Sequence, residues 1–128
     1  MSAIALFTDL HKYYLYEGRA DMRKSFDGLC GIVQNIMQRR MKEGDVYVFL
    51  NKELTHIKIL LYEPDGFTLF YRRLHKGRFK PPVTQTDRGP VALTAYELIC
   101  MLKGLHLHLQ NKGGYPHAIQ RSAHVVGS

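Results

Sequence analysis

The chain has 128 residues, the size of a single domain, and its 45% hydrophobic and 23% charged residues are typical of a folded globular protein. Eighteen Lys and Arg against eleven Asp and Glu give a net charge of +7, which favours polyanionic partners. No apolar run of about 18 residues is present, which excludes a transmembrane helix, and the N-terminus lacks the basic residues of a signal peptide.

A short strand and then a long helix are predicted for the first third of the chain. Three tyrosines within 11–17 favour the strand. Residues 21–38 carry apolar side chains at three- and four-residue spacing, which predicts an amphipathic helix with Asp21 as its N-cap. Gly28 and Gly31 each cost up to about 1 kcal/mol inside a helix, so we expect a close neighbour against that face.

An antiparallel meander is predicted next. Three apolar runs separated by turn residues indicate its strands: 46–50, 56–62 and 67–74. A three-residue loop at 64–66 places Ile57, Ile59, Leu61, Leu69 and Tyr71 on one face and Lys58, Leu60, Phe70 and Arg72 on the other. A four-residue loop reverses the faces of the third strand, so both registers stay open.

The last part of the chain is expected to hold an exposed connection, a helix and a tail. Pro and Gly residues within 80–90 indicate the connection. Thr94 and Glu97 have the spacing of a capping box, and leucines continue the helical pattern to Leu109. Residues 1–110 therefore form one domain, and 111–128, which show no apolar periodicity, are expected to be flexible.

The predicted fold is α+β, with a small antiparallel meander packed against an amphipathic helix and a second helix near the C-terminus. Six apolar residues are expected to be buried together between the first helix and the sheet: Phe26, Leu29, Val33, Ile57, Ile59 and Leu61. On that model, Phe26→Ala costs about 3–5 kcal/mol of stability.

A basic segment follows the third strand. No Asp or Glu occurs between Asp65 and Asp87. That gap contains the candidate nucleic-acid-binding residues Arg72, Arg73, Lys76, Arg78, Phe79 and Lys80. The cations suit phosphates, and Phe79 or Tyr71, if exposed, suits base stacking. The alternative is a solvated strand end whose charges prevent aggregation.

Arg23 and Lys24 form a second candidate site, at the start of the predicted helix. As an exposed basic end they suit phosphate or an acidic partner. The alternative is an N-cap at Asp21 with an Arg23–Asp27 ion pair, which contributes only a few tenths of a kcal/mol.

Catalytic interpretations have less support. The sequence contains the His-hydrophobic-His motif of single-strand nucleases at His106, Leu107 and His108, and Tyr115 follows it. If this segment is helical, however, the two imidazoles point about 200° apart and cannot share a metal ion. The acidic residues already have roles as caps and turns, and no phosphate-binding loop is present. Cys30 and Cys100 lie in apolar surroundings, which predicts buried thiols in a reducing cytoplasm. We therefore expect no catalysis, no metal site and no cofactor.

Several short sequence motifs, taken together, resemble those of the TnpB accessory proteins of bacterial insertion sequences of family sixty-six. They are the nonapeptide 21–29, Val48-Phe49 with Asn51, 57–60, 65–67, Arg72-Arg73-Leu74 followed by 77–79, and the helix 93–105 with Glu97-Leu98 and 103–105. The resemblance covers about 10–105 and does not extend into the tail. It implies a protein encoded beside a larger transposase and needed for efficient transposition, and it does not imply a nuclease.

The leading hypothesis is a non-catalytic transposition accessory protein that contacts DNA through 72–80 and has the transposase as its partner. Two alternatives remain: a pure protein-interaction module that bridges the transposase, and the single-strand nuclease. No membrane partner is expected, and the sequence sets no oligomeric state.

Overall fold

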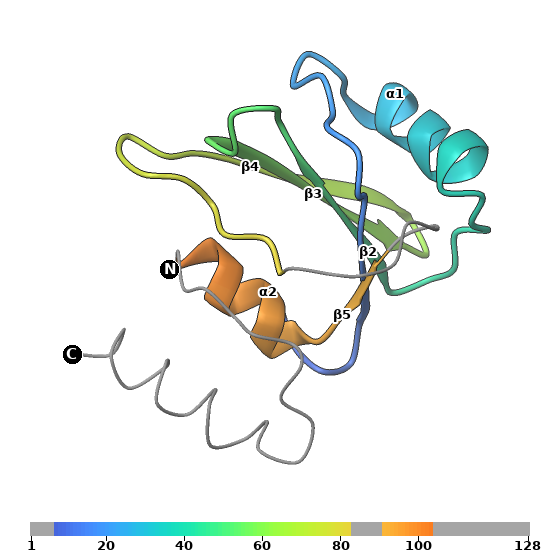
Figure 1. Ribbon diagram of the computed structural model, residues 1–128. Helices are drawn as coiled ribbons and strands as arrows, with labels where there is room; N and C mark the ends of the chain where they lie inside the picture. Colours follow the sequence, from blue (N-terminus) through green and yellow to red (C-terminus); the bar gives the residue numbers. More distant parts are fainter. Residues whose placement is uncertain (1–6, 83–90, 104–128) are drawn as a thin grey trace.

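The computed structural model describes residues 7–82 and 91–103 (Figure 1). The elements, in chain order, are β1 (Lys12–Leu15), α1 (Phe26–Gly31), the π-helix η2 (Ile32–Ile36), β2 (Asp45–Leu50), β3 (His56–Glu63), β4 (Gly66–Arg73), β5 (Val91–Leu93) and α2 (Ala95–Leu102). The strands form one sheet in the order β4-β3-β2-β1-β5, in which only the β1–β2 pair is parallel. This arrangement confirms the predicted α+β class and the N-terminal strand.

The sheet lies between two helical layers, with α1 on one face and α2 on the other (Figure 1). All six residues of β2 are buried, because both faces of this central strand are covered. The α2 face packs the aliphatic residues of β2 and β3 against Leu98, Met101 and Leu102. The α1 face packs Tyr47, Phe49 and Leu60 against the apolar side of α1 and η2.

The first helix is shorter than the sequence predicts. It begins at Phe26 with Ser25 as N-cap, and it continues as the π-helix η2 before Gln38 takes a positive φ of 54°. Asp21 is not the N-cap, because its carboxylate accepts the backbone N–H of Arg23 two residues later and so closes a local turn. The 21–24 segment is therefore a turn that precedes the helix.

The glycines of this helix do not mark a close neighbouring element. A Cβ at Gly28 would meet the side-chain carbons of Lys24 at 3.0 Å, and one at Gly31 would meet only Asn35, at 4.0 Å. The expected close neighbour is therefore present at Gly28, where it is the Lys24 side chain of the preceding turn, and not at Gly31.

The expected single core is divided into two. Ile57, Ile59 and Leu61 face α2, whereas Leu29 and Val33 pack on the opposite face of the sheet. Phe26 is 40% exposed and belongs to neither core. The prediction that all six residues are buried together was wrong, because α1 covers the alternate residues of β3.

The β3–β4 hairpin has a two-residue loop, because Glu63 pairs with Gly66. Ile57 faces Arg72 and Ile59 faces Phe70 across the ladder, while Lys58 faces Tyr71. The three-residue register was therefore wrong, and the faces follow the reversed alternative. This register places Tyr71 on the α1 face and Arg72 on the α2 face.

The capping box at the start of α2 is confirmed. The Thr94 hydroxyl accepts the backbone N–H of Glu97 at 3.0 Å, and the Glu97 carboxylate accepts that of Thr94 at 2.7 Å. The described part of this helix ends at Leu102. Its predicted continuation to Leu109, the tail 111–128 and most of the connection 80–90 lie outside the described residues. Among the helices that the structure describes, none is long and apolar enough to cross a membrane.

Candidate nucleic-acid interface

Three segments far apart in the sequence meet at one end of the sheet. After β1, the chain continues beside β2, where Tyr16 N–H donates to the Val48 carbonyl and Ala20 N–H to the Leu50 carbonyl. On the other side of the β2–β3 turn, Leu74 N–H donates to Thr55 and Phe79 N–H to Leu54. The turn at 51–55 therefore lies between the 16–24 and 74–80 segments. We call this end of the sheet, with these three segments, the basic end.

Asn51 holds the central turn together. Its side-chain oxygen accepts the backbone N–H groups of Thr55 and His56, both at 2.9 Å. Its amide nitrogen lies 3.0 Å from the Thr55 hydroxyl and from His56 Nδ1, and it also donates to Glu53 at 3.2 Å. These bonds hold the turn in place even though Leu54 has a positive φ of 61°.

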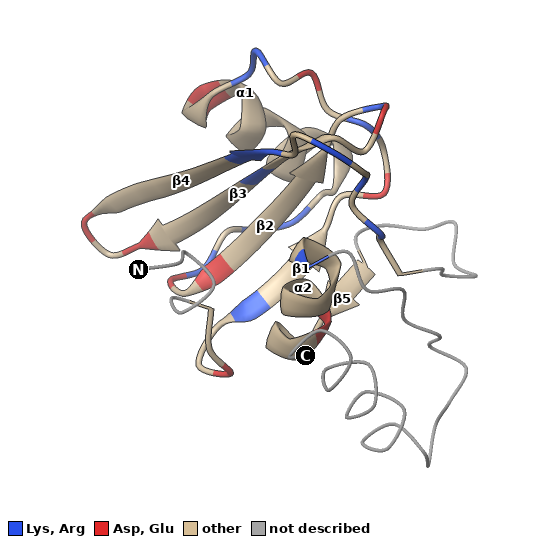
Figure 2. Cartoon of the chain, turned by 90° about the vertical axis from the view of Figure 1, so that its left-hand side faces the viewer, with Lys and Arg blue, Asp and Glu red and all other residues tan. Residues whose placement is uncertain are grey.

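Nine exposed Lys and Arg side chains occupy the basic end. They are Arg19, Arg23, Lys24, Lys52, Arg72, Arg73, Lys76, Arg78 and Lys80. Among the described residues, the exposed acids here are Asp21 and Glu53, and each is engaged by a hydrogen-bond donor. Figure 2 shows the blue segments gathered beyond the end of β4, with red residues at the β3–β4 hairpin on the opposite end. Most of the exposed Lys and Arg among the described residues therefore lie at this end of the molecule.

The predicted residues of the 72–80 segment divide into two groups. Arg72 and Arg73 point to opposite faces of the sheet, as strand alternation requires. Lys76, Arg78 and Lys80 are exposed in the loop that follows β4.

Phe79 has a different role from the one predicted. Its side chain is 1% exposed and belongs to the core on the α2 face, so the prediction that it stacks on a base was wrong. Its burial fixes the loop against the β2–β3 turn and leaves Arg78 and Lys80 exposed on either side of it.

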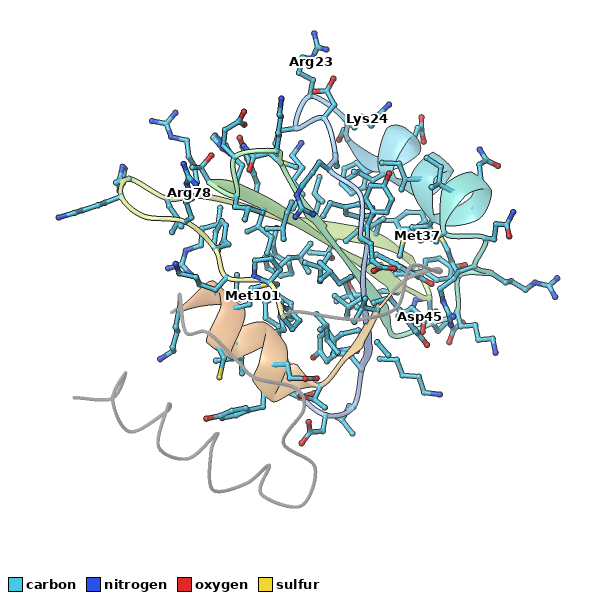
Figure 3. All side chains as sticks on the ribbon, in the orientation of Figure 1. Arg23, Lys24, Met37, Asp45, Arg78 and Met101 are labelled. Atoms are coloured by element: carbon cyan, nitrogen blue, oxygen red, sulfur yellow. The ribbon has the colours of Figure 1, made fainter. Side chains whose placement is uncertain are left out.

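Arg23 and Lys24 lie in the turn before α1, at the basic end (Figure 3). Arg23 pairs with Asp21 at 2.7 Å, and not with Asp27. The hydrogen bonds from the Arg23 guanidinium and backbone lower the pKa of Asp21 to about 2. The Lys24 carbonyl accepts a 2.7 Å bond from the ammonium of Lys58, which reaches it from β3. The second predicted site thus joins the same surface as the first.

A groove of about 300 Å³ opens beside the central turn. It is lined by Ala20, Asp21, Met22, Asn51, Lys52, Glu53, His56 and Tyr71. The sequence analysis did not predict this groove. It also did not predict that Arg19 and Lys52 are exposed at the basic end or that Lys58 donates to the Lys24 carbonyl. Only the pairing of distant segments brings these residues together. The one available sequence signal was Asn51 between two strands, because Asn side chains often hydrogen-bond the backbone of a turn.

Metal-ligating side chains and thiols were the other groups considered from the sequence. Within 7–82 and 91–103, no three His, Cys, Asp or Glu side chains are placed to share a metal ion. Cys100 is buried and Cys30 is half-buried, and burial raises the pKa of both thiols. His106, His108 and Tyr115 lie outside the described residues.

The chain has recognisable relatives. Residues 11–112 match a family model described as "IS66 Orf2 like protein", a range that extends past the 10–105 region carrying the resemblance. A protein of Sinorhizobium fredii named "Uncharacterized protein y4hO" is 28% identical over 94 residues, which cover 73% of this chain and 80% of that protein. No solved structure gives a significant match.

Proposed function

Because the chain belongs to the IS66 Orf2-like family of insertion-sequence accessory proteins, we propose that it assists the element-encoded transposase by binding DNA through the basic end. The protein itself carries out no cleavage or joining in this proposal. It supplies a charged surface on which transposon DNA is held while the separate transposase acts.

The observation that carries this proposal is the clustering of nine exposed cations at one end of the sheet. Lys and Arg on phosphates release condensed counterions, which gives strong affinity without base specificity. The loop from 74 to 80 is held by two backbone hydrogen bonds to the central turn and by the buried Phe79. Its cations are therefore presented from a fixed backbone, at a smaller entropic cost than on a free loop.

The salt dependence of DNA binding tests the proposal. Three or four phosphate contacts give a log–log slope of about −2.7 to −3.6 on duplex DNA. The double variant Arg78→Ala, Lys80→Ala should make that slope shallower by about two phosphate equivalents on unrelated sequences. Fluorescence anisotropy from low to moderate salt measures both slopes, and thermal unfolding should show little change because exposed charges contribute little to stability.

A matched control removes the same charge elsewhere. Arg40→Ala with Lys42→Ala takes two exposed cations from the segment that leads into β2, at the other end of the sheet, and should leave the slope unchanged. An equal effect of the two double variants would show that only net charge matters. If DNA affinity and slope survive Arg78→Ala, Lys80→Ala, the proposal is wrong.

A second candidate function has one specific observation in its favour. Phe26 is 40% exposed and Phe67 is 38% exposed, and their ring centroids lie 6.4 Å apart on the α1 side of the sheet. Ile36, at the end of η2, is 60% exposed. Exposed aromatic side chains of this kind suit contact with a protein partner. A transposase pull-down that resists salt and is lost in Phe67→Ser would favour this bridging function.

A further inference from the structure

We propose that the groove beside the β2–β3 turn binds one unpaired DNA base, which stacks on Tyr71 while the surrounding cations hold its phosphates. This inference rests on the proposed function and makes it more specific, since it assigns single-stranded DNA to one part of the basic end. Such strands arise wherever duplex DNA is opened or cut.

Tyr71 is placed as a stacking platform. Its side chain is 55% exposed on the edge strand β4 and lines the groove. His56 stacks beside it with centroids 5.9 Å apart and planes inclined by 25°, and the Lys58 ammonium lies over the ring, 5.0 Å from its centroid. These neighbours restrict the ring while more than half of its surface stays accessible. An aromatic ring held in this way loses little entropy when a base stacks on it.

The Asn51 turn holds the His56 ring by one of its two nitrogens. Because Asn51 Oδ1 accepts two backbone N–H groups, its nitrogen must be the atom that lies 3.0 Å from His56 Nδ1. The Thr55 hydroxyl also lies 2.7 Å from Nδ1, so the turn occupies this ring nitrogen and leaves Nε2 for a ligand. The groove thus contains a histidine whose ring is held by the turn through Nδ1 and whose Nε2 suits a polar atom of a base edge or a phosphate.

The charges around the groove suit a nucleotide. Lys52 lines it, and Arg73 lies directly across the ladder from His56 on the same face of the sheet. Asp21 and Glu53 also line it; Arg23 forms an ion pair with Asp21, whereas Glu53 keeps its charge and accepts a hydrogen bond from Asn51. The size of the groove matches the lower end of small-ligand pockets, about 300 Å³. It therefore fits one base and not a folded polypeptide segment.

A paired base is not available to this ring. Within a duplex each base is stacked on both sides, and taking it out of the stack costs a few kcal/mol. Tyr71 should therefore contribute to single-strand affinity, whereas the exposed cations contribute to both forms. This difference separates the groove from the general charge of the basic end.

The first experiment compares a labelled 12-nucleotide single strand with its duplex by fluorescence anisotropy. Tyr71→Ala should weaken single-strand binding by about 5- to 100-fold, leave duplex binding nearly unchanged and keep the salt slope of both. Tyr71→Phe should retain the affinity, because stacking requires the ring and not the hydroxyl. Tyr62→Ala is the matched control, since Tyr62 lies on the same face at the other end of β3, stacked on Phe67 at 5.0 Å.

The second experiment uses the absence of tryptophan from the chain. Tyr71→Trp introduces the only tryptophan of the chain into the groove, and a stacked base should quench its selectively excited emission with the same midpoint as the anisotropy titration. Tyr62→Trp provides the control and should not respond. The duplex should quench Tyr71→Trp weakly or not at all.

The outcomes separate this inference from the function on which it rests. If Tyr71→Ala binds single strands as tightly as the natural protein, or loses single-strand and duplex binding equally, the base-stacking groove is wrong. Salt-dependent duplex binding that depends on Arg78 and Lys80 would survive either result. If neither form of DNA binds with a salt-dependent affinity, the proposed function fails first.

Discussion

The two faces of the sheet are covered by different means. The α2 face is a large and mainly aliphatic core to which Phe79 adds its ring, and α2 carries its own capping box. The α1 face uses polar anchors as well: the Tyr47 hydroxyl donates to Asp45 at 2.8 Å, and the Arg39 guanidinium lies 3.7 Å from the Tyr14 ring centroid. A third anchor joins Lys58 to the carbonyl of Lys24.

This difference indicates which layer depends on the other. An isolated helix shorter than about 12–15 residues is marginal in water, and the helix formed by α1 and η2 (residues 26–36) also lacks the side-chain N-cap that α2 has. Its position is therefore set by the sheet through specific contacts. The turn that leads into it carries Asp21, Met22, Arg23 and Lys24 at the groove. Disturbing the α1 face should affect the groove as well as stability, whereas a change in α2 that leaves Phe79 and the 74–80 loop in place should affect stability alone.

The largest effect is expected on the α2 face. Leu98 is 0% exposed in the middle of α2, so Leu98→Ala should destabilise the protein by about 3–5 kcal/mol through lost burial and a cavity that the capped helix does not fill. Urea unfolding monitored by circular dichroism measures this loss. DNA affinity of the fraction that remains folded should equal that of the natural protein. Reduced affinity in that fraction would contradict the separation of the two faces.

A matched leucine on the α1 face should behave differently. Leu29 is also 0% exposed, but the short α1 is free of a side-chain cap and relaxes more readily into a cavity. Leu29→Ala should cost about 2–3 kcal/mol, at the lower end of the range for such changes. Because the 21–24 turn leads into α1, this variant should also weaken single-strand binding. If Leu29→Ala destabilises the protein as much as Leu98→Ala and leaves single-strand binding intact, the two faces of the sheet do not differ in the way proposed.

The smallest effect concerns Phe26, at the start of α1. Its 40% exposure and absence from both cores predict that Phe26→Ala costs about 1 kcal/mol, well below the 3–5 kcal/mol expected of a buried phenylalanine. The same urea titration measures it. A cost above about 3 kcal/mol would mean that the α1 layer packs more deeply on the sheet than its geometry indicates.

The candidate interface was only partly predictable. The cations of 72–80 and the pair Arg23 and Lys24 are visible as a charge pattern, and they do lie at one end of the sheet. The groove was not predictable, because Met22, Asn51 and Tyr71 belong to three separate segments that hydrogen bonding between strands brings together. Phe79 was misassigned for a similar reason, since its neighbour across the turn is Leu54, 25 positions earlier in the sequence.

The sequence by itself determined the features that depend on neighbours within about four residues. The capping box of Thr94 and Glu97, the turn at Pro64 and Asp65 and the extents of β2 and β3 follow from local hydrogen bonding and apolar periodicity. Only the tertiary structure decided which face each strand residue occupies, because a change of one residue in a hairpin loop reverses the faces of the whole following strand. It also decided that Asp21 closes a turn before the helix and that Tyr71 stands exposed beside His56. Those outcomes depend on the free energy of contacts between distant segments, which no local pattern records.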